Sequence, residues 1–151
     1  KGVGRLFIPT DFAKMHNREK GYVYFQEFIP NNSFDVRIIV IEHKAFAIKR
    51  LTRKNDFRAS GSGSIIYDRN HIDERCINIS VEINKKIKSQ SIAYDFVFDE
   101  NDNPLIVEVS YGYDVNAYDS CPGYWTSDLK WHVGSFNPQA WMAEYLIEKF
   151  K

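Results

Sequence analysis

The sequence predicts an α+β fold with a mainly antiparallel sheet and flanking helices. Three observations support this class. Strand-like segments follow one another in pairs joined by short turns, as hairpins do. Aromatic residues make up 15% of the 151 residues, which favours a strand-rich core. The helical stretches stand apart from these strands, whereas a parallel sheet would need strands and helices to alternate.

The first 30 residues come before the clearest hairpin. The chain begins at Lys1 with no initiator Met, so we expect a fragment that lacks an N-terminal domain. Residues 10–20 are expected to hold a short helix. Residues 22–29 are aromatic and β-branched, which indicates a strand, and residues 30–33 form the turn that ends it.

The middle of the chain supplies most of the predicted sheet. Residues 35–41 and 45–51 form a hairpin around residues 42–44. A glycine- and serine-rich loop at residues 58–64 follows and is rich in backbone donors.

Two helices and an irregular tail complete the prediction. Residues 77–89 carry one helical stripe of isoleucines, at positions 79, 83 and 87. Residues 111–136 are expected to be irregular. A final helix begins with Asn137 as its cap and Pro138 at its first position.

Two acids in the predicted hairpin of residues 92–98 and 105–110 are the most informative feature. With Asn101 and Asp102 at its tip, Asp95 faces Glu108 and Ala93 faces Ser110. The opposite face is wholly apolar, as a core face should be: Tyr94, Phe96, Phe98, Leu105, Val107 and Val109.

Opposed carboxylates destabilise a sheet unless something compensates their charge. One of them is protonated, or a basic side chain intervenes, or a cation lies between them. Oxygen ligands alone favour a hard ion such as Mg²⁺, which keeps open positions for phosphates. The alternative is an ordinary solvated strand face.

The preceding hairpin carries basic residues that suit polyphosphate chemistry. These are Arg37, Lys49, Arg50 and, just before the glycine-serine loop, Arg58. Arginine forks, lysine charges and backbone donors all bind phosphate. The alternative is that these charges form only the wet face of a hairpin.

Taken in order, these segments resemble the ATP-grasp superfamily, in the branch of the ribosomal-protein glutamate ligase and glutathione synthetase-like enzymes. The resemblance covers residues 1 to about 113. The matching segments are Lys1-Gly2-Val3 (lid loop), Gln26 to Pro30 (hinge strand), Asp35-Val36-Arg37, Lys49-Arg50 with Asp56-Phe57-Arg58, and Asp95 with Glu108-Val109-Ser110. It implies the C-terminal part of an ATP-grasp fold.

The resemblance implies a role for each matching residue. Glu27, Phe28 and Ile29 would bind adenine, Asp35 would bind ribose, and Arg37 and Ser60 would belong to the same nucleotide site. Arg58 and Lys49 would be catalytic and stabilise the transferred phosphate. Asp95, Glu108 and Ser110 would hold Mg²⁺, or Mn²⁺ in its place. Ser110 stands where the family usually has Asn, which shortens that ligand.

The resemblance also implies an organisation and an activity. Residues 1–30 would be the end of the lid subdomain and the hinge strand, and residues 31–151 the C-terminal subdomain with its aromatic tail. The reaction would be ATP-dependent amide formation from a carboxylate and an amine through an acylphosphate. This fragment alone is expected to be inactive. Similar proteins suggest bacterial surface-polysaccharide biosynthesis as the setting.

Composition limits the partners to small molecules. Lys+Arg and Asp+Glu both count 20, so no net field recruits nucleic acid or an anionic membrane. Cys76 and Cys121 lack the spacing of a zinc site or a disulfide framework, which indicates reduced thiols in the cytoplasm. The sequence leaves open whether the chain forms an oligomer.

Two other classes of function compete with the ligase. Opposed acids on a hairpin also serve two-metal nucleases, although the neutral charge gives no footprint for DNA. A noncatalytic carbohydrate-binding module would use the tail aromatics to stack on sugars. We instead expect the tail tryptophans, Trp125, Trp131 and Trp141, to be packed as core.

Overall fold

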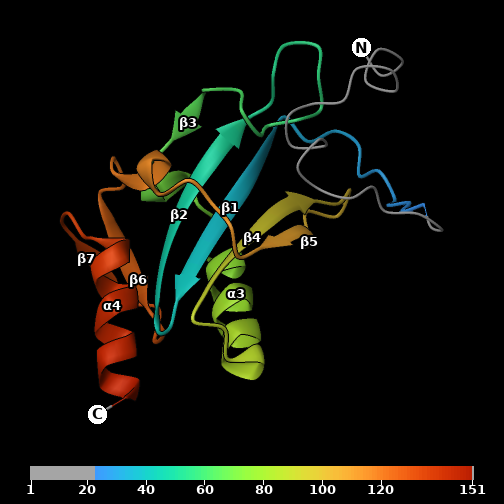
Figure 1. Ribbon diagram of the computed structural model, residues 1–151. Coiled ribbons are helices and arrows are strands. Elements are labelled where there is room, and N and C mark those ends of the chain that lie inside the picture. The colour runs from blue at the N-terminus through green and yellow to red at the C-terminus, as the bar shows by residue number, and fades with distance from the viewer. Residues whose placement is uncertain (1–22, 151) are drawn as a thin grey trace, which may run out of the picture.

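The computed structural model describes residues 23–150 as an antiparallel sheet covered on both faces (Figure 1). Its seven strands run in the order β5-β4-β1-β2-β6-β7, with β3 paired to β2. The strands are β1 (Phe34–Ile41), β2 (Lys44–Leu51), β3 (Ile65–Ile66), β4 (Ser91–Phe98), β5 (Pro104–Ser110), β6 (Gly123–Thr126) and β7 (Trp131–Val133). The helices are α3 (Glu74–Ile87) and α4 (Pro138–Lys149), with short 3-10 helices η1 (Arg69–His71) and η2 (Val115–Tyr118). The predicted α+β class is confirmed.

The β1–β2 hairpin forms the centre of the sheet, close to the predicted bounds. Asp35 pairs with Arg50, and Val36 pairs with Lys49. Because successive side chains alternate between faces, Asp35 and Arg50 share one face and Val36 and Lys49 share the other. We call these the front face and the back face.

Helix α3 covers the back face. Asp73 caps its N-terminus by accepting from the backbone N–H of Arg75 at 2.8 Å. Its buried residues are Cys76, Ile77, Ser80, Val81 and Asn84. The predicted isoleucine stripe was right in part: Ile79 and Ile83 are partly buried and pack against the core, whereas Ile87 is exposed. The fully buried face of α3 lies one residue beyond the isoleucine positions. It could not be recognised from hydrophobic spacing because it includes the polar residues Ser80 and Asn84.

The C-terminal tail covers one half of the front face. It contains β6 and β7, so the prediction of an irregular segment was wrong. Their pairing is very close, because a Cβ on Gly123 would lie 2.2 Å from the His132 carbonyl oxygen. The start of α4 was predicted correctly: Asn137 accepts from the N–H of Ala140 at 2.8 Å, and Pro138 follows.

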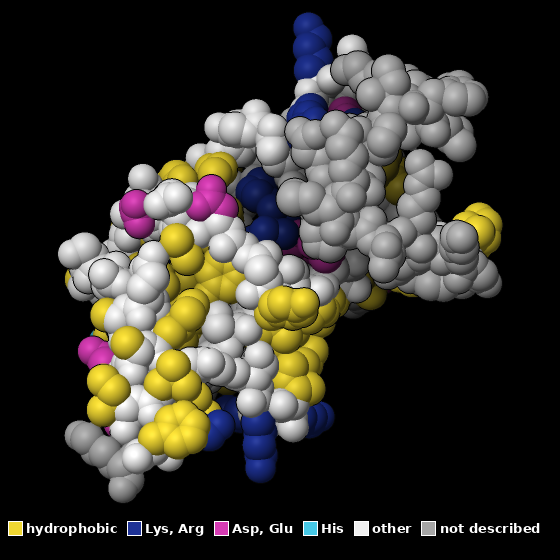
Figure 2. All heavy atoms as spheres, in the orientation of Figure 1, with side chains coloured by type: hydrophobic (Ala, Val, Ile, Leu, Met, Phe, Trp, Pro, Cys, Tyr) yellow, Lys and Arg dark blue, Asp and Glu magenta, His cyan; other side chains and the backbone are white. Residues whose placement is uncertain are grey.

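The aromatic side chains of the tail pack as predicted. Trp125 is fully buried with the back-face core, and Trp131 packs against that core. Trp141 packs with Phe136, Tyr124 and Phe46 in the front-face core. Figure 2 shows hydrophobic side chains over the half of this view that carries α4, whereas acidic and basic side chains meet nearer its centre.

The β4–β5 hairpin contains a bulge that changes its register. Asp95 pairs with Glu108, as predicted, but Phe96 pairs with Ile106 rather than with Val107. The predicted apolar face was therefore wrong along β5. Ile106 packs on the core, while Leu105 and Val109 are exposed. Consecutive residues of a regular strand point to opposite faces, but a bulge changes the direction of side chains. Val107 and Glu108 are consecutive, and both line the same pocket.

The segment before β1 differs from the prediction. Residues 23–29 form no strand in the described part of the chain, and Val23, Tyr24 and Phe25 are exposed. The segment contacts the sheet through the side chain of Gln26, which donates to the Val107 carbonyl at 3.0 Å. The predicted helix at residues 10–20 and the lid-loop match at residues 1–3 lie outside the described residues. Neither described helix is long and apolar enough to cross a membrane.

Candidate active site

A pocket of about 360 Å³ lies on the front face at the end that the tail leaves uncovered. The segment before β1, strands β1, β4 and β5, and the loop after β2 enclose it. Its lining includes Glu27, Phe28, Ile29, Asp35, Arg50, Arg58, Ser60, Asp95, Val107 and Glu108. Eight of the residues predicted to form the site therefore line one pocket.

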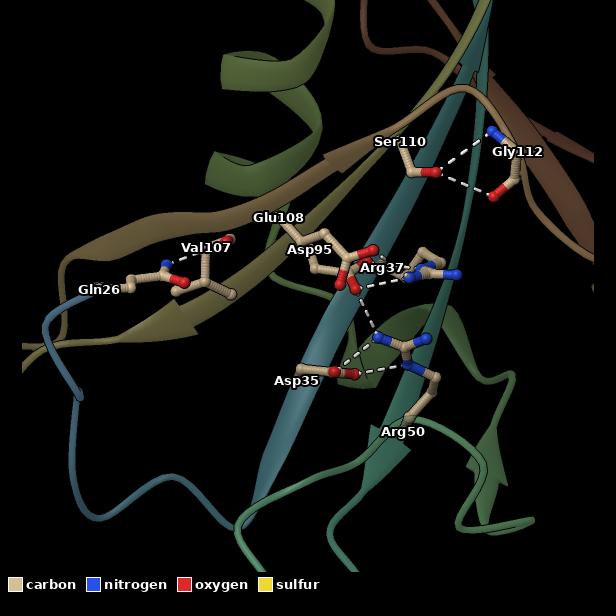
Figure 3. Close-up of polar contacts among 9 residues, drawn as sticks. All are labelled: Gln26, Asp35, Arg37, Arg50, Asp95, Val107, Glu108, Ser110 and Gly112. Atoms are coloured by element: carbon tan, nitrogen blue, oxygen red, sulfur yellow. Dashed lines mark hydrogen bonds and ion pairs between the residues drawn. The ribbon is translucent and has the colours of Figure 1, made fainter. Parts of the chain in front are cut away.

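Four charged side chains alternate across β1, β2 and β4 and form what we call the charged floor (Figure 3). Asp35, Arg50 and Asp95 line the pocket, and Arg37 joins them through Asp95. Arg37 donates to both oxygens of Asp95, at 2.5 and 2.6 Å. Arg50 donates to both oxygens of Asp35, at 2.7 and 2.6 Å, and also to Asp95 at 2.7 Å. Every charge is thus compensated by a hydrogen-bonded opposite charge, which is what partial burial requires.

The opposed acids Asp95 and Glu108 have very different surroundings. The side chain of Asp95 is 5% exposed and that of Glu108 is 60% exposed. The guanidinium of Arg37 lies beside both, with its Nη2 3.9 Å from the nearest Glu108 oxygen. Of the three ways to compensate opposed carboxylates, the structure shows the intervening basic side chain, and that side chain engages Glu108 only loosely.

The pKa shifts follow from burial and from these pairs. Burial raises the pKa of Asp35, and the Arg50 fork lowers it by less. Burial lowers the pKa of Arg37, but the hydrogen bond and charge of Asp95 raise it by more, so it ends above its ordinary value. Arg50 behaves in the same way through Asp35 and Asp95. The arginines therefore stay charged at every physiological pH.

These residues suit a magnesium ion at the mouth of the pocket. No group of three His, Cys, Asp or Glu side chains gathers as a metal cage within residues 23–150. Mg²⁺ does not need such a cage, since it is commonly held by one or two carboxylates together with phosphates and water. Glu108 is exposed, and Asp95 retains one lone pair, on Oδ1, beyond its three arginine contacts.

Arg58 and its loop form the most exposed wall of the pocket. Arg58 binds both oxygens of Asp56, at 3.0 Å from Nε and 2.5 Å from Nη2. This contact lowers the pKa of Asp56 to about 2. Arg53 donates to the Ser60 carbonyl and so ties the two ends of the loop together. Arg58 and Ser60 therefore reach the pocket on a loop whose turn is held by its own side chains.

The segment before β1 is joined to the end of β4 by one residue. Asn32 donates to the Phe98 carbonyl and accepts from the Phe98 N–H, both at 2.9 Å. Phe28 packs edge-on against Phe57 at 5.3 Å between ring centroids, which closes the apolar side of the pocket. Glu27, Phe28 and Ile29 are thereby held at the pocket without being part of the sheet.

Two predicted site residues lie elsewhere. Lys49 points to the back face, where its Nζ lies 3.5 Å from the centre of the Phe34 ring. Ser110 does not line the pocket, and its hydroxyl donates to the Gly112 carbonyl at 2.9 Å. Arg50, which had no assigned role, takes the central position instead. The alternation of side chains along the strands could have indicated this, because Arg50 rather than Lys49 shares a face with Asp35.

Comparison with known families identifies the domain. Residues 13–121 match the model of the RimK-like ATP-grasp domain, which is well over half of the chain. Among curated proteins, none matches the chain.

Proposed function

Because the chain belongs to the RimK-like ATP-grasp family, an ATP-dependent ligase family, we propose that it joins a carboxylate to an amine in an amide bond. ATP-grasp enzymes generally use ATP and Mg²⁺. We propose the same cofactors here, with Mn²⁺ as a substitute, and small molecules as both substrates.

The observation that carries the proposal is the charged floor of the pocket. Asp95 is held by two arginines while its partner Glu108 stays exposed and almost unpaired, at the same edge of the pocket. An exposed carboxylate beside two fixed cations suits a triphosphate with its metal, since both signs of charge are needed there. A solvated strand face would not require the buried network.

The pocket residues divide into two groups by chemistry. Phe28, Ile29 and Phe57 form the apolar side and would take the adenine ring, with backbone groups near Glu27 setting its orientation. Asp35 would bind ribose. Arg50, Arg58 and the loop at Ser60 would take the phosphates, because guanidinium groups and backbone N–H groups bind phosphate oxygens.

The reaction that fits this arrangement has two steps. The substrate carboxylate attacks the γ-phosphorus of ATP, which forms an acylphosphate and releases ADP. The amine then attacks the acyl carbon, the phosphate leaves, and the amine loses a proton. Arg58 would stabilise the charge on the transferred phosphoryl group, while Arg50 and Arg37 hold Asp95 in place through their hydrogen bonds.

The metal site would consist of Asp95 and Glu108. A bound Mg²⁺ would supply charge neutralisation for the phosphates. Ser110, bound to Gly112, could join only after giving up that contact. The setting we propose, bacterial surface-polysaccharide biosynthesis, rests on the resemblance of the sequence alone, and the cytoplasmic location rests on the spacing of Cys76 and Cys121.

Thermal shift with ATP and Mg²⁺ tests the proposal on the full-length protein. We expect a rise in melting temperature that needs both ligands and is lost in Glu108→Gln. This variant keeps the fold intact because Glu108 is exposed. Glu100→Gln is the matched control, an exposed acid in the turn of the same hairpin, and should behave like the wild type.

Two outcomes would contradict the proposal. A folded wild-type protein with no shift would leave the pocket without a nucleotide role. Cleavage of DNA with Mg²⁺ and no ATP would favour the nuclease instead. The carbohydrate-binding alternative is disfavoured because the tail tryptophans Trp125, Trp131 and Trp141 pack in or against the two cores.

A further inference from the structure

The backbone of Phe98, the last residue of β4, extends beyond the point where β4 and β1 stop pairing. The pairs of these two strands end at Val36 and Phe96. The same antiparallel register would place residue 34 opposite Phe98, to exchange both backbone hydrogen bonds with it. The side chain of Asn32 does this instead: it donates to the Phe98 carbonyl and accepts from the Phe98 N–H, both at 2.9 Å. A side-chain amide thus completes the sheet where β1 no longer pairs with β4.

The same amide fixes the turn that precedes β1. Its Nδ2 group also donates to the Pro30 carbonyl at 3.1 Å, so one side chain joins the turn to β4. Asn31 has a φ of 67°, in the left-handed region that asparagine adopts more readily than most residues. At the start of β1 the Thr52 N–H donates to the Ser33 carbonyl at 2.9 Å, which extends the pairing with β2. Ser33 thus fixes where β1 begins, and Asn32 fixes the direction from which the chain enters it.

This direction matters because the residues before the turn form one side of the pocket. Residues 27–29 line it, and so does Asn32 itself. Two further contacts of this segment are made by exposed side chains. Gln26 donates to the Val107 carbonyl at 3.0 Å, and Phe28 packs on the loop after β2. Contacts that water can reach open readily, so the half-buried Asn32 is the main support of the segment.

The phosphate side of the pocket has a separate support. Arg50 and Asp95 lie on β2 and β4 and are joined by a hydrogen bond of 2.7 Å. Glu108 lies on β5, paired with Asp95. None of these contacts involves Asn32. Loss of the Asn32 amide should therefore displace the base side of the pocket and leave the charged floor as it is.

We propose that Asn32 is a positioning residue that holds the backbone of residues 27–29 at the distance from the charged floor that an adenine nucleotide requires. This inference rests on the proposed function, because it concerns the same nucleotide. It gives Asn32 a part in binding the base rather than the phosphates, through the segment that it fixes.

Hydrogen–deuterium exchange with and without saturating ATP and Mg²⁺ tests the proposal on the full-length protein. In the wild type, ATP should slow exchange both in residues 26–29 and in the loop at residues 58–64. Asn32→Ala should abolish the slowing in residues 26–29 and retain it in the loop. It should also weaken ATP binding about tenfold, because the two hydrogen bonds to Phe98 are lost. Asn32→Ser, a residue common in turns, has a hydroxyl too short to span both groups of Phe98 and should give the same pattern.

Asn70→Ala is the matched control. Asn70 is exposed in η1, beside Lys49 on the back face, so its variant should bind ATP and exchange like the wild type.

Three outcomes would overturn the proposal while leaving the proposed function in place. The first is ATP-dependent slowing in residues 26–29 that persists in both Asn32 variants. The second is its loss in both regions at once, which would indicate a general structural effect. The third is a wild-type protein that binds ATP with slowing in the loop alone. A wild-type protein that binds no ATP would overturn both this inference and the proposed function.

Discussion

The two halves of the front face show how one sheet can carry both a site and a core. Along β1 the front residues change from Asp35 and Arg37 to Ile39 and Ile41. The first pair joins the charged floor of the pocket, and the second is buried under the tail. In one half hydrogen-bonded ion pairs fill the face, and in the other aromatic rings do.

The difference shows that stability and chemistry are assigned to different stretches of the same strands. The aromatic half removes apolar side chains from water, which is the main favourable term in folding. The charged half has little to gain from burial, because removing ions from water costs as much as their pairing returns. A network kept there without a stability advantage is best understood through what it binds.

The largest expected effect is loss of the buried acid of the charged half. Asp95→Ala should leave Arg37 and Arg50 without their shared partner and lower the free energy of unfolding by about 3–5 kcal/mol. Urea denaturation measures this change. Glu108→Ala, in the exposed partner, should cost at most about 0.5 kcal/mol. Equal losses in the two variants would contradict the division between a buried and an exposed acid.

In the aromatic half, Phe46→Ala should lower the free energy of unfolding by less than Asp95→Ala does. It should leave binding of ATP and Mg²⁺ unchanged. Phe46 is fully buried and contacts Tyr118, Phe136 and Trp141, so its removal leaves a cavity that costs about 3 kcal/mol. Denaturation again measures the change, with the exposed Leu146→Ala as control. The thermal shift with ATP and Mg²⁺ should persist, and its loss would show that the two halves are not separable.

The smallest effect is the titration of Asp56 on the pocket loop. Its pKa is lowered to about 2 by Arg58, so the stabilisation of the loop is present above the ordinary pKa of 3.8 and is lost as pH falls through about 2. NMR titration of the carboxyl carbon measures it. In Arg58→Gln the pKa should return to its ordinary range. An unchanged pKa in that variant would mean that Asp56 does not hold Arg58 in solution.

Local pattern determined much of the fold. The turn residues and β-branched runs placed the β1–β2 and β4–β5 hairpins, and the tip assigned to Asn101 and Asp102 put Asp95 opposite Glu108. Asn137 and Pro138 marked the start of α4, because capping depends on residues only three positions apart. The order of motifs was enough to indicate the ATP-grasp family, and with it the pocket residues from Glu27 to Glu108.

Other features depended on contacts between distant segments. The bulge at Val107 and the packed face of α3 are set by what lies against each strand or helix, so local pattern misassigned Leu105, Val109 and Ile87. The choice of Arg50 over Lys49 follows from which face closes the pocket. The bidentate pair of Arg37 and Asp95 joins residues 58 positions apart. The sequence alone thus determined the residue types and strand pairs of the site, whereas only tertiary packing decided which charges meet there, since Coulomb and hydrogen-bond energies depend on distance in space.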